Sequence, residues 1–470
     1  MIPASPQFVA AQRILQKLHA KGYQAYLAGG CVRDLLLGRE PKDYDVATSA
    51  TPEIVLDLFP RTFAVGAHFG VVLVSDEIDG APVLTEVATF RHDGAYSDGR
   101  RPDAVRYTLS AEEDVQRRDF TINGLLLNPA EIVAGSDLRD AVLDSVGGLS
   151  DLDAGVLRAI GRAELRFDED QLRMLRAVRF AARFGFEIEA GTQMAMRSLA
   201  YKIESVSLER VREELTRMLT EGHARRAFEL LDATGLLEYV LPEATRMKGV
   251  EQPPQYHPEG DVWVHTLMLL EQLEAGCSMT LAWGALLHDI GKPATYQPPA
   301  GPGDRIRFNG HVEVGVRIGA EICRRLRFSN DETEQVLALV QNHMRFADAD
   351  RMKASTLKRF FRLERFPEHL ALHRMDCMAS SGNLDHYNFA AERYWNMPVE
   401  EVSPAPLLTG RDLIAAGYVP GTAFKTILHA VEEAQLEGSI RSTEEALALV
   451  RAQFHLAADA ATDRKNESTS

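Results

Sequence analysis

Long apolar runs are missing from this sequence, and cysteines are few. No stretch approaches the ~18 consecutive apolar residues that a membrane-spanning helix needs. The four cysteines lie far apart and form no CxxC pair, which excludes a disulfide framework and a structural zinc site. The N-terminal segment lacks the basic, apolar and small-residue parts of a secretory signal, so none is expected. We therefore expect a cytoplasmic protein without a membrane segment.

Positive charge is also in short supply. The 52 Lys and Arg residues stand against 68 Asp and Glu residues, which leaves a net charge of −16. Such a total argues mildly against a nucleic-acid partner, although local patches decide that question. The chain of 470 residues is 45% hydrophobic and 26% charged, as is usual for a folded globular protein. At about 100–200 residues per domain, we expect three or four domains.

The spacing of apolar residues predicts four regions along the chain. Residues 1–150 combine short strand patterns with helical spacing, so we expect a mixed sheet with helices. Residues 151–255 and 256–400 have almost wholly helical spacing. Residues 401–470 predict a small helical tail that ends in a polar, disordered segment. The predicted fold class is a multidomain α+β protein in which the regions after the first are all-α.

Two glycines near the N-terminus predict a phosphate site. The stretch LAGGCVRDLLLG, which begins at residue 27, places them between a short strand and a helix-like segment. Free backbone N–H groups at such a helix start bind phosphate well, with Gly30 among them. Arg33, one turn further on, would add positive charge to the site.

Paired carboxylates follow this stretch and predict a metal site. Asp43 and Asp45 flank Tyr44, and residues i and i+2 of a strand point to the same side of it. Two convergent carboxylates suit Mg²⁺, whose remaining positions can be filled by substrate phosphates. Glu86, in the apolar stretch TEVATF, is a candidate for a third carboxylate.

Three ordered motifs carry a family resemblance over roughly residues 20–255. They are GGCVRDLLLG-x4-DYD, RRDFTIN at 117–123 and EDQLR at 169–173. Together they resemble the motifs of class II nucleotidyltransferases of the polymerase-β superfamily, which include bacterial tRNA CCA-adding enzymes and poly(A) polymerases. The resemblance implies a polymerase-β-like head in residues 1–150 and a helical neck and body in residues 151–255.

The resemblance also implies a role for each matching residue in the head. Asp43 and Asp45 would hold two Mg²⁺ ions that bridge the triphosphate and lower the pKa of the RNA 3′-hydroxyl. Pyrophosphate would leave after in-line attack. The nucleotide would be held by Gly30 and Arg33 at its phosphates, by Arg118, and by Asp119 at a ribose hydroxyl.

The EDQLR motif predicts nucleotide selection without a nucleic-acid template. On a helix, Asp170 and Arg173 would be neighbours on one face. A carboxylate accepts from the exocyclic amino group of cytosine or adenine, and a guanidinium donates to ring nitrogen or carbonyl oxygen. The pair could therefore select C and A over U and G. Arg176 and Arg179 continue the stripe, and the family uses both in nucleotide binding.

A second resemblance lies in residues 256–400. The order H…HD…D resembles the HD superfamily of metal-dependent phosphohydrolases, and its members here are His265, His288, Asp289 and Asp376. Imidazoles with carboxylates suit Ni²⁺, Mn²⁺ or Co²⁺ better than Mg²⁺. His311 and His343 could extend the site to a second metal or bind phosphate.

These motifs favour a tRNA nucleotidyltransferase that adds or repairs the 3′-terminal CCA from CTP and ATP, with possible phosphohydrolase activity in the HD region. Poly(A) polymerase is the main alternative, because it shares the head motifs. CC-only addition is less favoured, because the loop RHDGAYSDGRRPD (91–103) is intact. An alarmone-type enzyme or hydrolase is a further alternative, although its HD unit normally precedes the transferase. The sequence does not separate CCA addition from A-only addition.

Overall fold

The computed structural model describes residues 4–66, 70–94, 105–133, 136–255 and 257–454. The chain divides into two compact units. The first contains residues 1–250, 270–282 and 321–328, and the second contains residues 251–269, 283–320 and 329–470. None of the helices in the described part of the chain has the length and apolar character needed to cross a bilayer.

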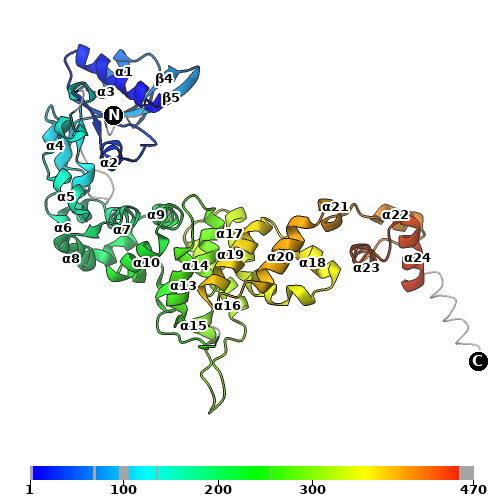
Figure 1. Ribbon diagram of the computed structural model, residues 1–470. Helices are drawn as coiled ribbons and strands as arrows, with labels where there is room; N and C mark the ends of the chain where they lie inside the picture. Colours follow the sequence, from blue (N-terminus) through cyan, green and yellow to red (C-terminus); the bar gives the residue numbers. More distant parts are fainter. Residues whose placement is uncertain (1–3, 67–69, 95–104, 134–135, 256, 455–470) are drawn as a thin grey trace, which may run out of the picture. The chain divides into compact units, whose positions relative to one another are not determined.

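A seven-stranded sheet forms the centre of the N-terminal region (Figure 1). Its order is β3 (Thr62–Gly66), β4 (Val71–Ile78), β5 (Ala81–Thr89), β2 (Val46–Thr48), β1 (Ala25–Ala28), β8 (Leu126–Leu127) and β9 (Val142–Leu143). Neighbours pair antiparallel except β2 and β5, which run parallel. The sheet is therefore mixed, as the sequence predicts.

Helix α1 (Pro6–Ala20) packs on this sheet (Figure 1). Its apolar residues recur with helical spacing, and Ile14, Leu15 and Leu18 join the strands in one buried core. The Ser5 side chain accepts a hydrogen bond from the Phe8 backbone N–H and so caps the helix start. The short helix α2 (Gly30–Leu36) contacts β1, and α3 (Pro52–Leu58) contacts β4 and β5; Val32 of α2 and Val55 of α3 join the same core.

The rest of the first unit is mainly helical. Its helices are α4 (Ala111–Gln116), α5 (Gly148–Ala154), α6 (Ala163–Glu169), α7 (Leu172–Phe184), α8 (Ala190–Leu199), α9 (Leu208–Thr220), α10 (Ala224–Ala233), α11 (Leu236–Val240) and α12 (Pro242–Thr245). Two short ladders accompany them: β6 (Arg91–Asp93) with β7 (Val105–Tyr107), and β10 (Val156–Leu157) with β11 (Glu187–Ile188). Helix α7 ends at Gly185, whose positive φ of 72° favours glycine.

The regular elements in the described residues of the later part of the chain are helices, with two isolated bridges, Glu251 with Asp261 and Gln297 with Arg307. The helices are α13 (Val262–Glu271), α14 (Met279–Leu287), α15 (Lys292–Thr295), α16 (His311–Arg325), α17 (Asn330–Asn342), α18 (Ala354–Phe361), α19 (Phe366–Ala379), α20 (Asp385–Asn396), α21 (Val399–Val402), α22 (Gly410–Ala415), α23 (Ala423–Leu436) and α24 (Thr443–Gln453). A 3₁₀ segment, His343–Arg351, follows α17.

Three details differ from the sequence predictions or lie outside the described residues. The first residues of the predicted loop 91–103 form strand β6. This strand depends on its pairing with β7, which lies further along the chain, so the local sequence alone does not predict it. Residues 95–103 of that loop and the polar C-terminal segment 455–470 lie outside the described residues.

Candidate functional site

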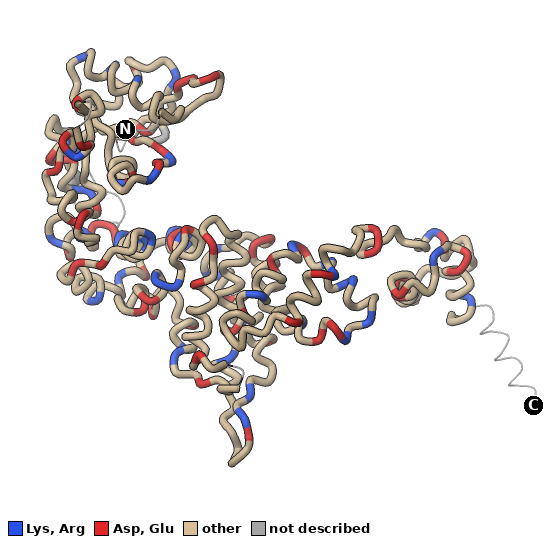
Figure 2. Tube along the Cα trace, viewed as in Figure 1, with Lys and Arg blue, Asp and Glu red and all other residues tan. Residues whose placement is uncertain are grey.

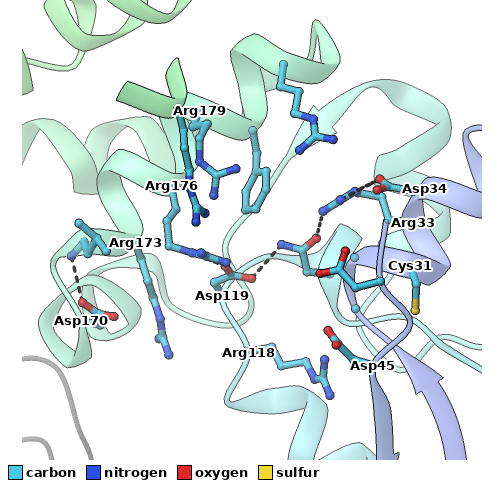
Figure 3. Close-up of a pocket in the computed structure, with 18 of the residues that line it drawn as sticks. Cys31, Arg33, Asp34, Asp45, Arg118, Asp119, Asp170, Arg173, Arg176 and Arg179 are labelled. Carbon is cyan, nitrogen blue, oxygen red and sulfur yellow. Dashed lines mark hydrogen bonds and ion pairs between the residues drawn. The ribbon is translucent and has the colours of Figure 1, made fainter. Parts of the chain in front are cut away.

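A cavity of about 560 Å³ in the first unit contains most of the predicted head residues (Figure 3). Helices α2, α7 and α9 line it, together with the segment before β2 and the loop after α4. Nine arginines and Lys42 line it against five aspartates, although the whole chain is acidic. Figure 2 shows acidic and basic positions interleaved over the helices of this unit. The local excess of positive charge suits a polyphosphate.

The predicted metal carboxylates lie beside the two glycines. Asp43 and Asp45 both line the cavity, but they precede β2 rather than lie in it. Their convergence therefore comes from the extended segment that leads into the strand, and not from strand alternation as predicted. The Asp45 carbonyl accepts a hydrogen bond from the Ala28 N–H at 3.0 Å, which holds this segment next to Gly29.

Glu86 lies on β5, the parallel neighbour of β2, and its side chain is exposed. The register pairs Val46 with Val87, so Glu86 is level with Asp45. Burial and, to a smaller extent, the nearby carboxylates of Glu86 and Asp43 raise the pKa of Asp45 to about 6, although Arg118 acts to lower it. This crowding of negative charge is what a bound divalent cation would relieve.

Arg33 is buried at the start of α2, where the sequence predicts a phosphate site. Its Nε and Nη2 atoms donate to Asp34 Oδ1 at 2.9 and 2.7 Å, and its Nη1 donates to Asn123. Gly30 lines the same cavity, and Gly29 has a positive φ of 72° at the helix start. A Cβ at Gly29 would lie 3.2 Å from Arg118 Nη1, so the glycine allows this close approach.

Arg118 and Asp119, from the RRDFTIN motif, both line the cavity. Arg118 Nη2 donates to the buried Asp114 at 3.0 Å. Asp119 accepts from Arg176 Nη2 at 2.8 Å and from Asn123 Nδ2 at 3.0 Å. Although burial opposes it, the Arg176 guanidinium and the Asn123 amide lower the pKa of Asp119 to about 2.

The predicted placement of Asp170 and Arg173 on one helix is wrong. Asp170 has extended φ and ψ angles between α6 and α7, and its carboxylate accepts from the Leu172 N–H at 3.1 Å. It thus lies one residue before Gln171, the N-cap of α7, and accepts from the N–H of the first residue of that helix. Arg173 pairs with Glu169 at 2.7 Å, and Asp170 pairs with Arg210 at 2.9 Å. Both nevertheless line the cavity.

Arg176 and Arg179 continue along α7 and also line the cavity. Arg179 is buried, and its Nε donates to Glu214 on α9 at 2.6 Å. Sequence reasoning missed several lining residues: Asn123, Phe180, Arg183, Arg210 and Arg217. Arg183 continues the α7 stripe at helical spacing and could have been found, whereas Arg210 and Arg217 come from α9 and needed the fold.

The second predicted site is a histidine and aspartate cluster in the second unit. It borders a cavity of about 700 Å³ that Asp289, His311, His343 and Asp376 help to line. His265 Nε2 lies 3.1 Å from Asp376 Oδ1, and His288 Nε2 lies 3.1 Å from Asp289 Oδ2. The structure therefore brings together all four residues of the H…HD…D order.

Two of these histidine nitrogens are buried without a hydrogen bond. Neither His265 Nε2 nor His288 Nε2 has a hydrogen-bond partner in the described part of the protein. Each lies 3.1 Å from a carboxylate oxygen, that of Asp376 for His265 and that of Asp289 for His288. Side chains that point at a common centre rather than at one another suit ligation of a cation, because an unpaired buried nitrogen is otherwise unfavourable.

The other nitrogen of each ring is fixed from behind. The Nδ1 atoms of His288, His311 and His343 lie 2.7–3.0 Å from backbone carbonyl oxygens, and His265 Nδ1 lies 2.7 Å from Glu259. Such contacts direct Nε2 toward the centre, as is common for histidine ligands of metals. The Oδ2 atom of Asp289 faces His265 and His288. Its Oδ1 atom lies 3.8 Å from the Nε2 atoms of His311 and His343.

The pKa shifts differ among the residues of the cluster. Burial disfavours the charged form of His265, but Asp376 and Glu259 raise its pKa to about 9. Burial lowers the pKa of His343 to about 4, despite the attraction of Asp289. Asp289 itself has a pKa well below its usual range, because His288 and Lys292 outweigh its burial. Lys292 Nζ lies 2.7 Å from Asp289 Oδ2.

Comparison with known proteins gives the family. The poly(A) polymerase head domain matches residues 25–158, the probable RNA- and SrmB-binding site of polymerase A matches residues 185–248, and the tRNA nucleotidyltransferase domain 2 matches residues 315–450. A CCA-adding enzyme of Latilactobacillus sakei is 37% identical over 291 residues, which is 61% of this chain and 70% of that protein. The chain belongs to the family of CCA-adding enzymes.

Two further CCA-adding enzymes extend this finding. That of Leuconostoc mesenteroides is 44% identical over 234 residues, 50% of this chain and 55% of that protein, so the chain matches little more than half the length of such curated relatives. The crystal structure of the Bacillus stearothermophilus enzyme in complex with CTP is 26% identical, covers 98% of this chain and 100% of its own, and has a TM-score of 0.71. The predicted fold class, a mixed-sheet nucleotidyltransferase head before a largely helical body, is confirmed.

Proposed function

We propose that this protein is a tRNA nucleotidyltransferase that adds or repairs the 3′-terminal CCA from CTP and ATP, without a nucleic-acid template and with release of pyrophosphate. One observation carries this function: a single cationic cavity holds Asp43 and Asp45 together with Asp170 and Arg173. The carboxylates that could hold a metal and the polar groups that could contact a base thus line the same cavity. The CCA-adding relatives, one of them in complex with CTP, support the same conclusion.

The head residues fit Mg²⁺, because Asp43 and Asp45 line one cavity, and burial together with the carboxylates of Glu86 and Asp43 raises the pKa of Asp45. Mg²⁺ held by Asp43 and Asp45, with Glu86 beside them, would lower the pKa of the RNA 3′-hydroxyl and neutralise triphosphate charge. The chain itself would bind the phosphates near Gly30 and Arg33. Arg118 and Asp119 would hold the nucleoside.

Base selection would occur at the junction of α6 and α7. Asp170 can accept from the amino group of cytosine or adenine, because its two oxygens offer about four lone-pair positions and the contacts with Arg210 and Leu172 leave room. Arg173 would donate to the base beside it, and Arg176 and Arg179 would complete the nucleotide site. A hydrogen-bonding site of this kind rejects U and G, because they leave its groups unpaired.

The test is incorporation of each labelled nucleotide into defined RNA ends. The purified protein should extend tRNA that lacks CCA with both C and A, and tRNA that ends in CC with A alone. Repeated addition of A to a non-tRNA primer would indicate poly(A) polymerase instead. Extension that stops after CC would indicate CC-only addition.

We also propose a metal-dependent phosphohydrolase in residues 256–400, supported by the unpartnered Nε2 atoms of His265 and His288. With Asp289 and Asp376 these residues form an N/O donor set that fits Ni²⁺, Mn²⁺ or Co²⁺. The ion would supply an activated water and polarise a phosphoester. His311 and His343, on the other side of Asp289, would hold a second ion or a phosphate. Hydrolysis of p-nitrophenyl phosphate with each metal tests this activity.

A further inference from the structure

Asn123 occupies a central position in the head cavity that no role above explains. It is buried, 7% exposed, and lies between Arg33 of α2 and Asp119. Its Oδ1 accepts from Arg33 Nη1 at 2.5 Å, and its Nδ2 donates to Asp119 Oδ1 at 3.0 Å. The amide therefore connects a phosphate-side arginine to a nucleoside-side carboxylate.

An amide can make both contacts at this position, because it carries one acceptor and one donor group. A guanidinium donates and never accepts, and an ionised carboxylate accepts and never donates. The orientation of the Asn123 amide is thus set by its partners, with the oxygen toward Arg33 and the nitrogen toward Asp119. An aspartate at this position would keep the contact with Arg33 and repel Asp119. A leucine has nearly the same size as asparagine and would lose both contacts.

The connection continues on both sides of the amide. Asp119 Oδ2 accepts from Arg176 on α7 at 2.8 Å, and Arg33 is held by Asp34 at 2.7 Å. Phe180 strengthens the same path, because the guanidinium carbons of Arg33 and Arg176 each lie 5.2 Å from its ring centroid. A continuous polar chain thus joins α2, next to the catalytic carboxylates, with α7, which carries Arg173.

We propose that Asn123 is a positioning residue that holds the phosphate-binding Arg33 in register with the nucleoside-binding Asp119. This inference rests on the proposed nucleotidyl transfer and adds to it. Asn123 does not touch the reacting atoms and does not read the base. It makes the placement of the triphosphate depend on the placement of the nucleoside, so that both halves of one nucleotide must fit before transfer occurs.

The test compares Asn123→Asp with Asn123→Leu over pH 5.5 to 8. The charged groups in contact with Asn123 are Arg33 and Asp119, and those that interact with these two are Asp34, Arg173, Arg176 and Arg183. At pH 8 we expect both variants to lower kcat/KM for CTP and for ATP about 10- to 100-fold, with the C and A preference unchanged. Two carboxyls about 3 Å apart share a proton as the pH falls, which restores a donor in Asn123→Asp alone.

The decisive quantity is therefore the ratio of each variant's kcat/KM to that of the wild type. For Asn123→Asp this ratio should rise several-fold between pH 8 and pH 5.5, whereas for Asn123→Leu it should stay constant. Asn128→Asp, outside the cavity and paired with Glu131, is the matched control and should behave as the wild type. Circular dichroism and thermal melting confirm that each variant is folded.

Two outcomes would overturn the role of Asn123. One is kcat/KM within twofold of the wild type for both variants. The other is an equal loss for both at every pH, which would mean that the amide only fills space. Equilibrium binding of CTP, measured at the same pH values, gives an independent readout. A wild-type protein that binds CTP but transfers no nucleotide contradicts the proposed function, and the binding ratios then decide on Asn123 by the same criterion.

Discussion

The head cavity and the histidine cluster are both polar and partly buried, but they satisfy their polar groups in opposite ways. In the head, guanidinium groups are paired with carboxylates: Arg176 with Asp119, Arg179 with Glu214 and Arg210 with Asp170. In the cluster, the Nε2 atoms of His265 and His288 are buried with no hydrogen bond. These head pairs are complete in the protein alone, although the Nε atom of Arg118 is buried there without a hydrogen bond to any described residue, whereas the two histidine nitrogens of the cluster have no such pair.

This difference indicates the kind of ligand that each site takes. A nucleotide brings its own donors and acceptors, so a site for it can keep its side chains paired and exchange some pairs on binding. A bare cation brings only charge and needs lone pairs that converge and remain free. We therefore expect substitutions in the head to change rates and base choice, and substitutions in the cluster to change metal content.

The largest effect is expected at the head carboxylates. Asp43→Ala or Asp45→Ala should lower nucleotide transfer by on the order of 10³-fold or more, while tRNA binding largely persists. Because Asp45 has a raised pKa, Asp45→Asn should not lower the melting temperature at pH 8 without Mg²⁺. Asp57→Ala, at an exposed position of α3, is the control. Transfer near the wild-type rate in either carboxylate variant would contradict the assignment.

The next largest effect separates the two sites. Asp289→Ala should abolish hydrolysis of p-nitrophenyl phosphate and reduce bound Ni²⁺, Mn²⁺ or Co²⁺, because Asp289 faces both histidine pairs. Nucleotide addition should continue, since the cluster belongs to the other unit. Asp43→Ala should show the reverse pattern, and the exposed Asp348→Ala should affect neither. Wild-type protein with no hydrolysis and no bound transition metal by elemental analysis would remove the hydrolase role.

The sequence predicted much of both sites and missed what depends on distant partners. The GGCVRD and DYD stretches identified Arg33, Asp43 and Asp45 because their spacing is local. The helical placement of Asp170 failed, because this aspartate has extended backbone angles at the end of α6 and is not within a helix. Its partner Arg210 is 40 residues away, and no local pattern connects them. Glu259, which orients His265, was missed although it is close in sequence, because solvated glutamates are common near loops.

The third effect concerns base choice. Arg173→Ala should reduce the preference for C and A over U and G by about 10-fold or more, because one good base contact contributes about 1–3 kcal/mol of discrimination. The measurement is incorporation of all four nucleotides. Arg162→Ala, whose side chain is exposed and lies outside the cavity, is the control. An unchanged preference at a reduced rate would mean that Arg173 supports α6 through Glu169 and that selection occurs elsewhere.

The smallest effect tests whether unpartnered histidine nitrogens alone mark a metal site. His369 on α19 is 2% exposed, and both of its ring nitrogens lack hydrogen-bond partners among the described residues. Unlike His265, it is in none of the groups of side chains that could hold a metal in that part of the chain. We therefore expect His369→Leu to leave metal content and hydrolysis unchanged.

The same variant should change stability in a pH-dependent way. Burial lowers the pKa of His369 to about 4, so between about pH 4 and 6.5 the unfolded chain binds a proton that the folded chain does not. Stability from this group is thus present above pH 6.5 and lost as the pH falls, by on the order of 1 kcal/mol at pH 5.5. His369→Leu should remove that loss, which thermal melts at pH 5.5 and 8 would detect as a smaller drop in melting temperature. The exposed His429→Leu should keep the wild-type drop. A loss of metal in His369→Leu would instead mean that the metal site extends along α19. Buried histidine nitrogens without hydrogen bonds would then mark a metal site even where no carboxylate converges with them.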